Sequence, residues 1–383
     1  MIHSVSPNLG NPVTYWFLRL LLFLSLFVTG YVISYGRNSL KKYWLISLPV
    51  MTLYTLVQGL RYMRDWDYPH YVYDLTQGLY SEYSEPIYIF WANTFRILHI
   101  PFVWAFLFYS LILVFGFFLL LKNFHKAAVW ACPLFLVIPQ ECTNLIRMFF
   151  AMAFLLIAIH YLINQRKKAY LFLLVSCMIH FSVIPFVLIV LILNWKKVGL
   201  LSNHFLIVLI AYFLIVCYWD ITIFDDLTMA LSLMESTGFA QGDAYLENAD
   251  AWLGTGGSIS AKYGFKTAGI LMTTLNVCVP AYIMYYGNKA YKIEPKLKII
   301  FGCTIFAFFI NQLGGDIELY QRYYHWATCL IPILIGAIWY FVKMKFIERA
   351  IFVFLMCLYY YGANFLNYLY QPSAVGYGFI WDI

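Results

Sequence analysis

The chain has 383 residues, of which 63% are hydrophobic, 21% are aromatic and only 11% are charged, and its formal net charge is +7. A soluble protein carries about 25% charged residues, so this chain lacks the polar surface that would cover a globule of its size in water. The composition therefore excludes a soluble enzyme and predicts a single integral membrane domain over residues 1–383. The net charge alone does not indicate a function, because the charges of a membrane protein must first be assigned to one side of the bilayer or the other.

The apolar runs that are long enough, or nearly long enough, to cross a hydrocarbon core of about 30 Å predict a polytopic all-α protein. They lie at about 14–35, 43–60, 101–121, 127–140, 146–163, 169–194, 204–219, 264–287, 299–314, 323–343 and 348–366. Basic clusters separate these runs, and the positive-inside rule assigns all of the clusters to the cytoplasm. The clusters are Arg37/Lys41/Lys42, Lys122/Lys126, Arg166/Lys167/Lys168, Lys196/Lys197, Lys289/Lys292/Lys296/Lys298 and Lys343/Lys345/Arg349.

The run 169–194 has basic clusters at both ends, so it cannot be a single crossing if both ends are cytoplasmic. We expect a hairpin of two short helices, about 169–181 and 183–194, with His180 at its outer tip. Pro185 then falls in the first turn of the second helix, where its missing N–H costs little. The hairpin brings the total to about twelve membrane segments, with both termini outside.

The acidic residues indicate which face of the membrane carries the chemistry. In this topology sixteen of the eighteen aspartates and glutamates lie outside, all except Glu294 and Glu348, although none of them entered the assignment. Two long outer segments, 61–100 and 220–263, hold most of the polar residues. Connections of this length in a compact protein are more often functional than idle, so we expect the active face to be the outer one.

The first outer segment combines arginine, carboxylates and tyrosines directly after a span. Tyrosine faces stack on sugar rings and arginine forks grip phosphate oxygens, which makes Tyr68, Tyr71 and Arg61 candidates for these two tasks. The alternative is an aromatic belt at the lipid headgroups with solvated charges. After Pro86, residues 87–99 are apolar on one helical face, and their length suits an interfacial helix on the outer leaflet.

Two arginines stand at the ends of apolar runs. Arg147 is placed one turn into the expected helix 146–163, and Arg322 opens the run 323–343. An arginine in a membrane segment is a functional candidate because its insertion is costly. The two side chains could converge on one anion; the alternative for Arg147 is snorkelling to the headgroups. His180, the ionisable residue of the hairpin, is either a base or a helix-packing donor.

Several motifs of nucleotide and metal chemistry are missing from the sequence. It contains no Walker lysine loop, no Rossmann glycine fingerprint, no HExxH and no carboxylate pair with metal-ligand spacing. Seven of the eight cysteines lie in apolar runs and none has metal-ligand spacing. We therefore expect no cofactor, no metal ion and no nucleic-acid partner.

Five short motifs are spread over residues 59–326. They are GLRY-x4-DY-x2-Y with Arg61, Asp67, Tyr68 and Tyr71; Glu85-Pro86 before a short helix; NLIR with Arg147; H-x-S with His180 and Ser182; and RYY with Arg322, Tyr323 and Tyr324. As a set they resemble the EpsG family, the Wzy-like polymerases of bacterial capsular polysaccharides and exopolysaccharides. Two positions depart from the pattern of that family: Asp65 stands where it usually has glycine, and Met148 where it usually has glutamine.

The resemblance implies a GT-C-like membrane glycosyltransferase in the bacterial inner (plasma) membrane, acting at the outer face. It would transfer a growing chain from undecaprenyl diphosphate to a sugar hydroxyl of the incoming lipid-linked repeat unit, in capsule, exopolysaccharide or O-antigen synthesis. Its partners would be the undecaprenyl-diphosphate-linked oligosaccharide, membrane lipids and a chain-length regulator. The donor arrives activated, so the reaction would need no nucleotide.

The same resemblance implies roles for the candidate residues. The diphosphate would be bound by Arg147, Arg322 and Arg61, the acceptor proton would be taken by His180, Asp67 or Glu85, and the sugars would be bound by Tyr68, Tyr71, Tyr323, Tyr324 and His325. The alternatives are an O-antigen ligase-like transferase, which differs mainly in its acceptor, and a flippase of the lipid-linked unit. A flippase would place its charges along a path through the bilayer.

The topology makes a direct prediction about two lysines. Lys167 and Lys196 should lie on the same, cytoplasmic side, because the hairpin between them returns to the face from which it starts. In a background without the native cysteines, cysteine at either position should react with an impermeant maleimide only after the membrane is opened, whereas cysteine at Thr76 should react in intact cells. Labelling of the two lysine positions from opposite sides would remove the hairpin and invert every later segment.

Overall fold

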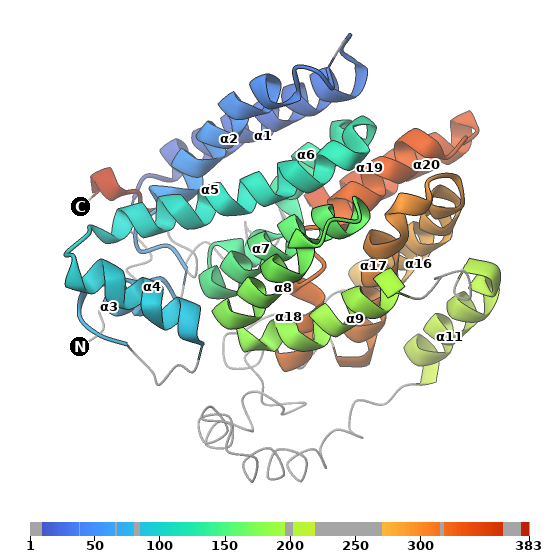
Figure 1. Ribbon diagram of the computed structural model, residues 1–383. Coiled ribbons are helices and arrows are strands. Elements are labelled where there is room, and N and C mark those ends of the chain that lie inside the picture. The colour runs from blue at the N-terminus through green and yellow to red at the C-terminus, as the bar shows by residue number, and fades with distance from the viewer. Residues whose placement is uncertain are drawn as a thin grey trace, which may run out of the picture.

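Figure 1 shows the computed structural model of the chain, which describes residues 10–37, 39–65, 67–79, 85–195, 202–218, 270–314, 318–362 and 377–382. Within these ranges the regular structure is helical, apart from an isolated antiparallel bridge between Arg61 and Phe379. The all-α prediction is therefore confirmed for this part of the chain. The second long outer segment, 220–263, lies outside the described residues.

The helices follow the predicted apolar runs. They are α1 (Pro12–Tyr35), α2 (Tyr43–Gly59), α3 (Tyr68–Thr76), α4 (Pro86–Ile97), α5 (Phe102–Leu121), α6 (Ala128–Val137), α7 (Ile146–Ile163), α8 (Lys168–Ile179), α9 (Ile184–Trp195), α11 (Phe205–Tyr218), α16 (Ile270–Ile293), α17 (Lys298–Gly314), α18 (Glu318–His325), α19 (Ile331–Phe341) and α20 (Phe346–Met356). Four helical stretches of the described residues are long and apolar enough to cross a membrane: Pro12–Tyr35, Phe102–Val137, Ile146–Ile163 and Pro295–Leu313. The total of about twelve segments and the GT-C-like architecture stay predictions.

The predicted span 323–343 is divided in the structure. Helix α18 ends at His325, turns follow, and α19 begins at Ile331 with Pro332 in its first turn. Proline has no N–H to donate and disfavours a helical conformation in the residue before it, so a helix more readily starts there than continues through it. The prediction of one helix was wrong, and Arg322 lies in the last turn of α18 rather than at the start of a long span.

The break predicted within 169–194 is confirmed. Helix α8 ends at Ile179, His180 is extended with φ −154° and ψ 109°, and α9 begins at Ile184 after a short 3₁₀ turn. In Figure 1 both helices extend from this turn toward the same side of the molecule, so the chain runs toward the turn in α8 and away from it in α9. Helix α8 packs on α7 and α9 packs on α17, so the turn with His180 lies where helices from both halves of the chain meet.

Small residues allow the closest helix contacts. A Cβ atom on Gly116 of α5 would lie 2.7 Å from the carbonyl oxygen of Ala153 in α7, and one on Gly30 of α1 would clash with the carbonyl of Ala128 in α6. Helices in lipid associate through close packing of this kind, since lipid tails are as apolar as the side chains. Helix α7, which carries Arg147, is thus held directly against α5, and α8 also packs on it.

Helix α4 is the helix predicted over residues 87–99. Its Tyr88 and Phe95 are buried against the protein, whereas Phe90 and Ile97 are 71% and 69% exposed. The predicted apolar face is therefore divided between the protein interior and the surroundings. Exposed apolar side chains on a short amphipathic helix suit the predicted place at the outer leaflet, which stays a prediction.

Candidate active site

Glu85, Arg147 and His180 meet in the structure although they lie far apart in the sequence. Nδ1 of His180 lies 3.1 Å from Oε1 of Glu85, and Nη1 of Arg147 donates to Oε2 of the same carboxylate at 3.4 Å. Glu85 is only 2% exposed and His180 only 7%. Three predicted site residues are thus joined through one buried carboxylate.

Each of these residues stands at the end of a helix. Glu85 is extended directly before α4, Arg147 is the second residue of α7, and His180 separates α8 from the turn that leads to α9. Arg147 therefore lies at the very start of its helix, not one turn into it as predicted. A charge at a helix end is less costly in a membrane protein than one at the middle of an apolar helix, and this favours the clustering of polar groups here.

The segment that begins with α18 also reaches this cluster. Burial lowers the pKa of His180, and the charges of Arg147 and Arg322 lower it further; the hydrogen bond to Glu85 raises it only in part, so the pKa falls from 6.5 to about 4. The ring of Trp326, which is fully buried, has its centroid 6.0 Å from that of His180. Both candidate arginines are therefore within electrostatic reach of the same imidazole.

Glu85 is ionised in this environment. Burial raises the pKa of its carboxyl group, but the hydrogen bond from His180 and the charge of Arg147 outweigh burial and lower the pKa from 4.5 to about 2. A carboxylate of such low pKa is a poor base at neutral pH, where the best base has a pKa near the pH. It is a good acceptor for Nδ1–H of His180, which leaves Nε2 as the basic nitrogen.

Arg61 and Asp67 belong to a second group of contacts, around the loop in front of α7. The guanidinium of Arg61 donates to a carbonyl oxygen of α2 and, at 3.3 Å, to that of Thr143. The backbone N–H of Asp67 donates to Oδ1 of Asn144 at 3.0 Å. The first motif thus holds the loop that leads into Arg147, and the described contacts of Arg61 lie in this group rather than around Glu85.

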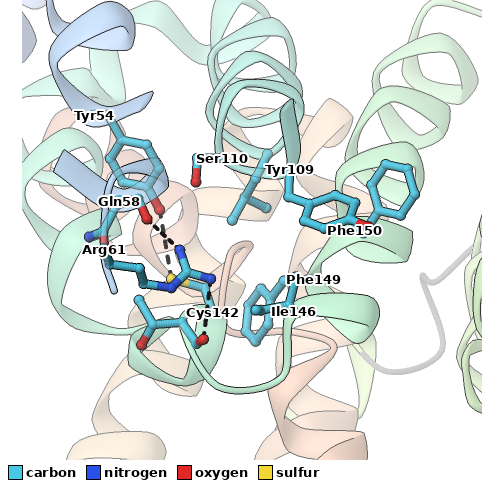
Figure 2. A pocket seen from close by; sticks show the side chains of 11 residues that line it. Tyr54, Gln58, Arg61, Tyr109, Ser110, Cys142, Ile146, Phe149 and Phe150 are labelled. Carbon is cyan, nitrogen blue, oxygen red and sulfur yellow. Dashed lines mark hydrogen bonds between the residues drawn. The ribbon is translucent and has the colours of Figure 1, made fainter. Parts of the chain in front are cut away.

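Arg61 also lines the cavity shown in Figure 2, together with Tyr54, Tyr109 and Cys142. The cavity volume of about 10 Å³ leaves room for about one water molecule. A sugar ring does not fit into this space. In the part of the chain that the structure describes, no three histidine, cysteine or carboxylate side chains come together in a way that could hold a metal ion.

Asp65 adopts the backbone conformation for which glycine is suited at this position. Its φ of 73° lies in the left-handed region, which glycine enters freely and which aspartate tolerates better than most residues. The carbonyl oxygen of Asp65 accepts a hydrogen bond from the N–H of Tyr68 at 3.4 Å. The departure from the glycine pattern therefore changes the residue without removing the turn.

The predicted sugar-binding residues differ in their exposure. Tyr68 is fully buried, its ring stacks on Phe106 with centroids 4.6 Å apart, and its hydroxyl donates to the carbonyl of Arg61. No face of this ring is open to a sugar, so the structure does not support the sugar-binding prediction for Tyr68 and gives it a packing role. The other four candidates are partly exposed: Tyr71, Tyr323, Tyr324 and His325.

Some residues near the cluster do not stand out in the sequence. Trp326 carries no signal, because its contact with His180 depends on segments distant in the chain. Asn144 belongs to the NLIR motif, but its contact with Asp67 could not be predicted from that motif. Asp74 and Tyr88 are buried residues of α3 and α4, and Tyr88 lies next to Arg147.

The chain was compared with known proteins and families. A family model described as the EpsG family matches residues 41–380, nearly the whole chain. No curated protein and no solved structure matches it. The matched range contains both groups of contacts, from Arg61 to Trp326. The chain therefore belongs to the EpsG family, a family of Wzy-like polymerases, which indicates a membrane-bound polysaccharide polymerase.

Proposed function

We propose that the protein polymerises undecaprenyl-diphosphate-linked oligosaccharide repeat units at the outer face of the bacterial inner membrane. It transfers the growing chain from its lipid diphosphate to a sugar hydroxyl of the incoming repeat unit, with membrane lipids and a chain-length regulator as further partners. One observation carries the proposal: the carboxylate of Glu85 lies 3.1 Å from the candidate base His180 and 3.4 Å from the candidate phosphate ligand Arg147.

The cluster suits the chemistry of such a transfer. Nε2 of His180 takes the proton of the acceptor hydroxyl while the hydroxyl oxygen forms a bond to the anomeric carbon of the donor sugar. The bond from that carbon to the diphosphate oxygen breaks, and its electron pair leaves on the diphosphate. Arg147 and Arg322 stabilise the charge that develops there, since guanidinium groups pair well with phosphate oxygens. The diphosphate already activates the donor, so no nucleotide supplies energy.

Glu85 acts on the base rather than on the substrate. Its low pKa makes it a weak proton acceptor, but its negative charge orients the imidazole and stabilises the imidazolium that forms in the transfer. Among the predicted bases this favours His180 over Glu85, because the imidazole, with its pKa of about 4, is neutral at pH 7 and is the stronger base of the two. Asp67, which is partly exposed, stays the alternative base.

Arg61 acts on the loop in front of α7 rather than on the diphosphate. Its side chain is 3% exposed and its donors hold carbonyl oxygens of α2 and of Thr143. A bidentate grip on phosphate needs two free, parallel donors at the surface. The sugars lie against the partly exposed aromatic residues of α3 and α18, which are Tyr71, Tyr323, Tyr324 and His325.

The test of the function is elongation by purified variants with a lipid-linked repeat unit. Arg147→Lys and Arg322→Lys should each reduce polymer formation by about 100-fold or more, because an ammonium cannot reproduce bidentate contacts to phosphate. Arg96→Lys is the matched control, since Arg96 bonds to Asn93 on its own helix and should tolerate lysine. Polymer at the wild-type level from both site variants would leave the diphosphate site without support.

The assignment of the base makes a separate prediction. His180→Gln should lose elongation by about 100-fold or more, because an amide can donate a hydrogen bond to Glu85 but cannot take a proton. His180→Ala should behave in the same way, and both should retain binding of the lipid-linked unit. Turnover by His180→Gln at the wild-type rate would remove histidine as the base and move the assignment to Asp67.

The ionised state of Glu85 predicts a pH dependence of stability. A carboxylate whose pKa is lowered on folding stabilises the folded state above its ordinary pKa, and this contribution is lost as the pH falls from about 4.5 to about 2. His180 titrates in the same range, since burial lowers its pKa to about 4, so the comparison is made in a His180→Gln background, where the amide keeps a donor to Glu85. The melting temperature of His180→Gln in detergent should fall over this range by more than that of the double variant His180→Gln/Glu85→Gln. Equal slopes would mean that Glu85 is not ionised in the folded protein.

A further inference from the structure

We infer that Tyr88 and Asp74 are positioning residues that hold the guanidinium of Arg147 in place. The inference deepens the proposed function and rests on it, because it concerns how the diphosphate-binding arginine is oriented. Neither residue is among the candidates that the sequence motifs supply. Both come from the first outer segment, one from α3 and the other from α4.

The ring of Tyr88 forms a platform for Arg147. Cζ of Arg147 lies 5.4 Å from the centroid of this ring, within the range in which a cation is attracted to an aromatic face. Tyr88 is only 1% exposed, and the attraction is stronger where water is excluded. The ring therefore favours one position of the guanidinium.

Asp74 fixes the platform in turn. The hydroxyl of Tyr88 donates to Oδ2 of Asp74 at 2.7 Å, and Asp74 is fully buried. A buried hydrogen bond to a carboxylate is short and strong, so this bond fixes the hydroxyl end of Tyr88 and the direction of the long axis of its ring. Because Asp74 lies on α3, this bond also ties α3 to α4, which pack directly on each other.

Glu85 and Tyr88 reach Arg147 from one short stretch of chain. Glu85 is the residue directly before α4 and Tyr88 is the third residue of this helix. Glu85 accepts from Nη1 of Arg147 and Tyr88 offers its ring face. A guanidinium has donors along separate edges and can serve a carboxylate and a phosphate at once, so two partners from residues 85–88 restrict the positions that this guanidinium adopts.

The test is binding of undecaprenyl diphosphate to the full-length protein in nanodiscs. Tyr88→Leu should weaken binding by about 10-fold, the loss expected when a buried cation–π contact is removed. Tyr88→Phe keeps the ring but loses its bond to Asp74, so it should lose about threefold, and an unchanged affinity would overturn the role of Asp74. Asp74→Asn keeps an acceptor for the hydroxyl and should bind like wild type. Phe90→Leu is the matched control, because it makes the same kind of change at an exposed residue of the same helix and should bind like wild type.

A second measurement separates positioning from mere packing. In an Arg147→Ala background, Tyr88→Leu should cause no further loss of binding, because the residue through which it acts is gone. If Tyr88→Leu does not fold, fluorinated phenylalanines at position 88 keep the shape of the ring while they weaken its negative face. Affinity should then fall with each added fluorine.

Three outcomes would overturn these assignments in distinguishable ways. Folded Tyr88→Leu that binds within twofold of wild type, or fluorination without effect, overturns the platform. An equal loss on adding Tyr88→Leu to wild type and to Arg147→Ala shows that Tyr88 acts by packing and not through Arg147. Wild type that does not bind the lipid diphosphate at all contradicts the proposed function itself, before any variant is compared.

Discussion

The site depends on a single buried carboxylate that an arginine and a histidine share. Glu85 is almost fully buried, and a buried carboxylate is costly unless charges and hydrogen bonds compensate for the lost water. Arg147 supplies this compensation from α7 and His180 from the turn between α8 and α9. One charge thus fixes three segments relative to one another. Removal of Glu85 leaves Arg147 and His180 without this partner, and removal of either of them leaves the buried carboxylate with less compensation.

The placement of the charges bears on the choice between a transferase and a transporter. In the described part of the chain, the arginines and carboxylates of both groups stand at helix ends, in the first outer segment, before α7 and in α18. A transporter places ionisable groups along a path through the bilayer, near its midplane. Groups gathered at helix ends around one carboxylate suit a reaction that takes place at one face.

Local sequence patterns predicted the helices and part of the site, but not the contacts between helices. The basic clusters on both sides of 169–194 were enough to predict the break at His180, and the cost of an arginine in an apolar run identified Arg147. The burial of Arg61 and Tyr68 was not predictable, because it depends on Thr143, 82 residues away, and on Phe106 of another helix. A motif rich in Arg, Asp and Tyr has the same sequence pattern whether its side chains face a substrate or hold a neighbouring loop, so the pattern does not distinguish the two roles.

The contacts of the first motif, which contains Arg61 and Asp67, explain why its side chains hold a neighbouring loop. Helix α7 begins one residue before Arg147, so the positive end of the helix dipole and the guanidinium act in the same region, where both favour an anion. Electrostatic stabilisation of a developing charge is effective only when the groups that provide it need not reorient. Arg61 and Asp67 hold residues 143 and 144, and close packing on α5 holds the helix that follows. In the proposed function the motif therefore keeps the start of α7 in place, where Arg147 meets the diphosphate.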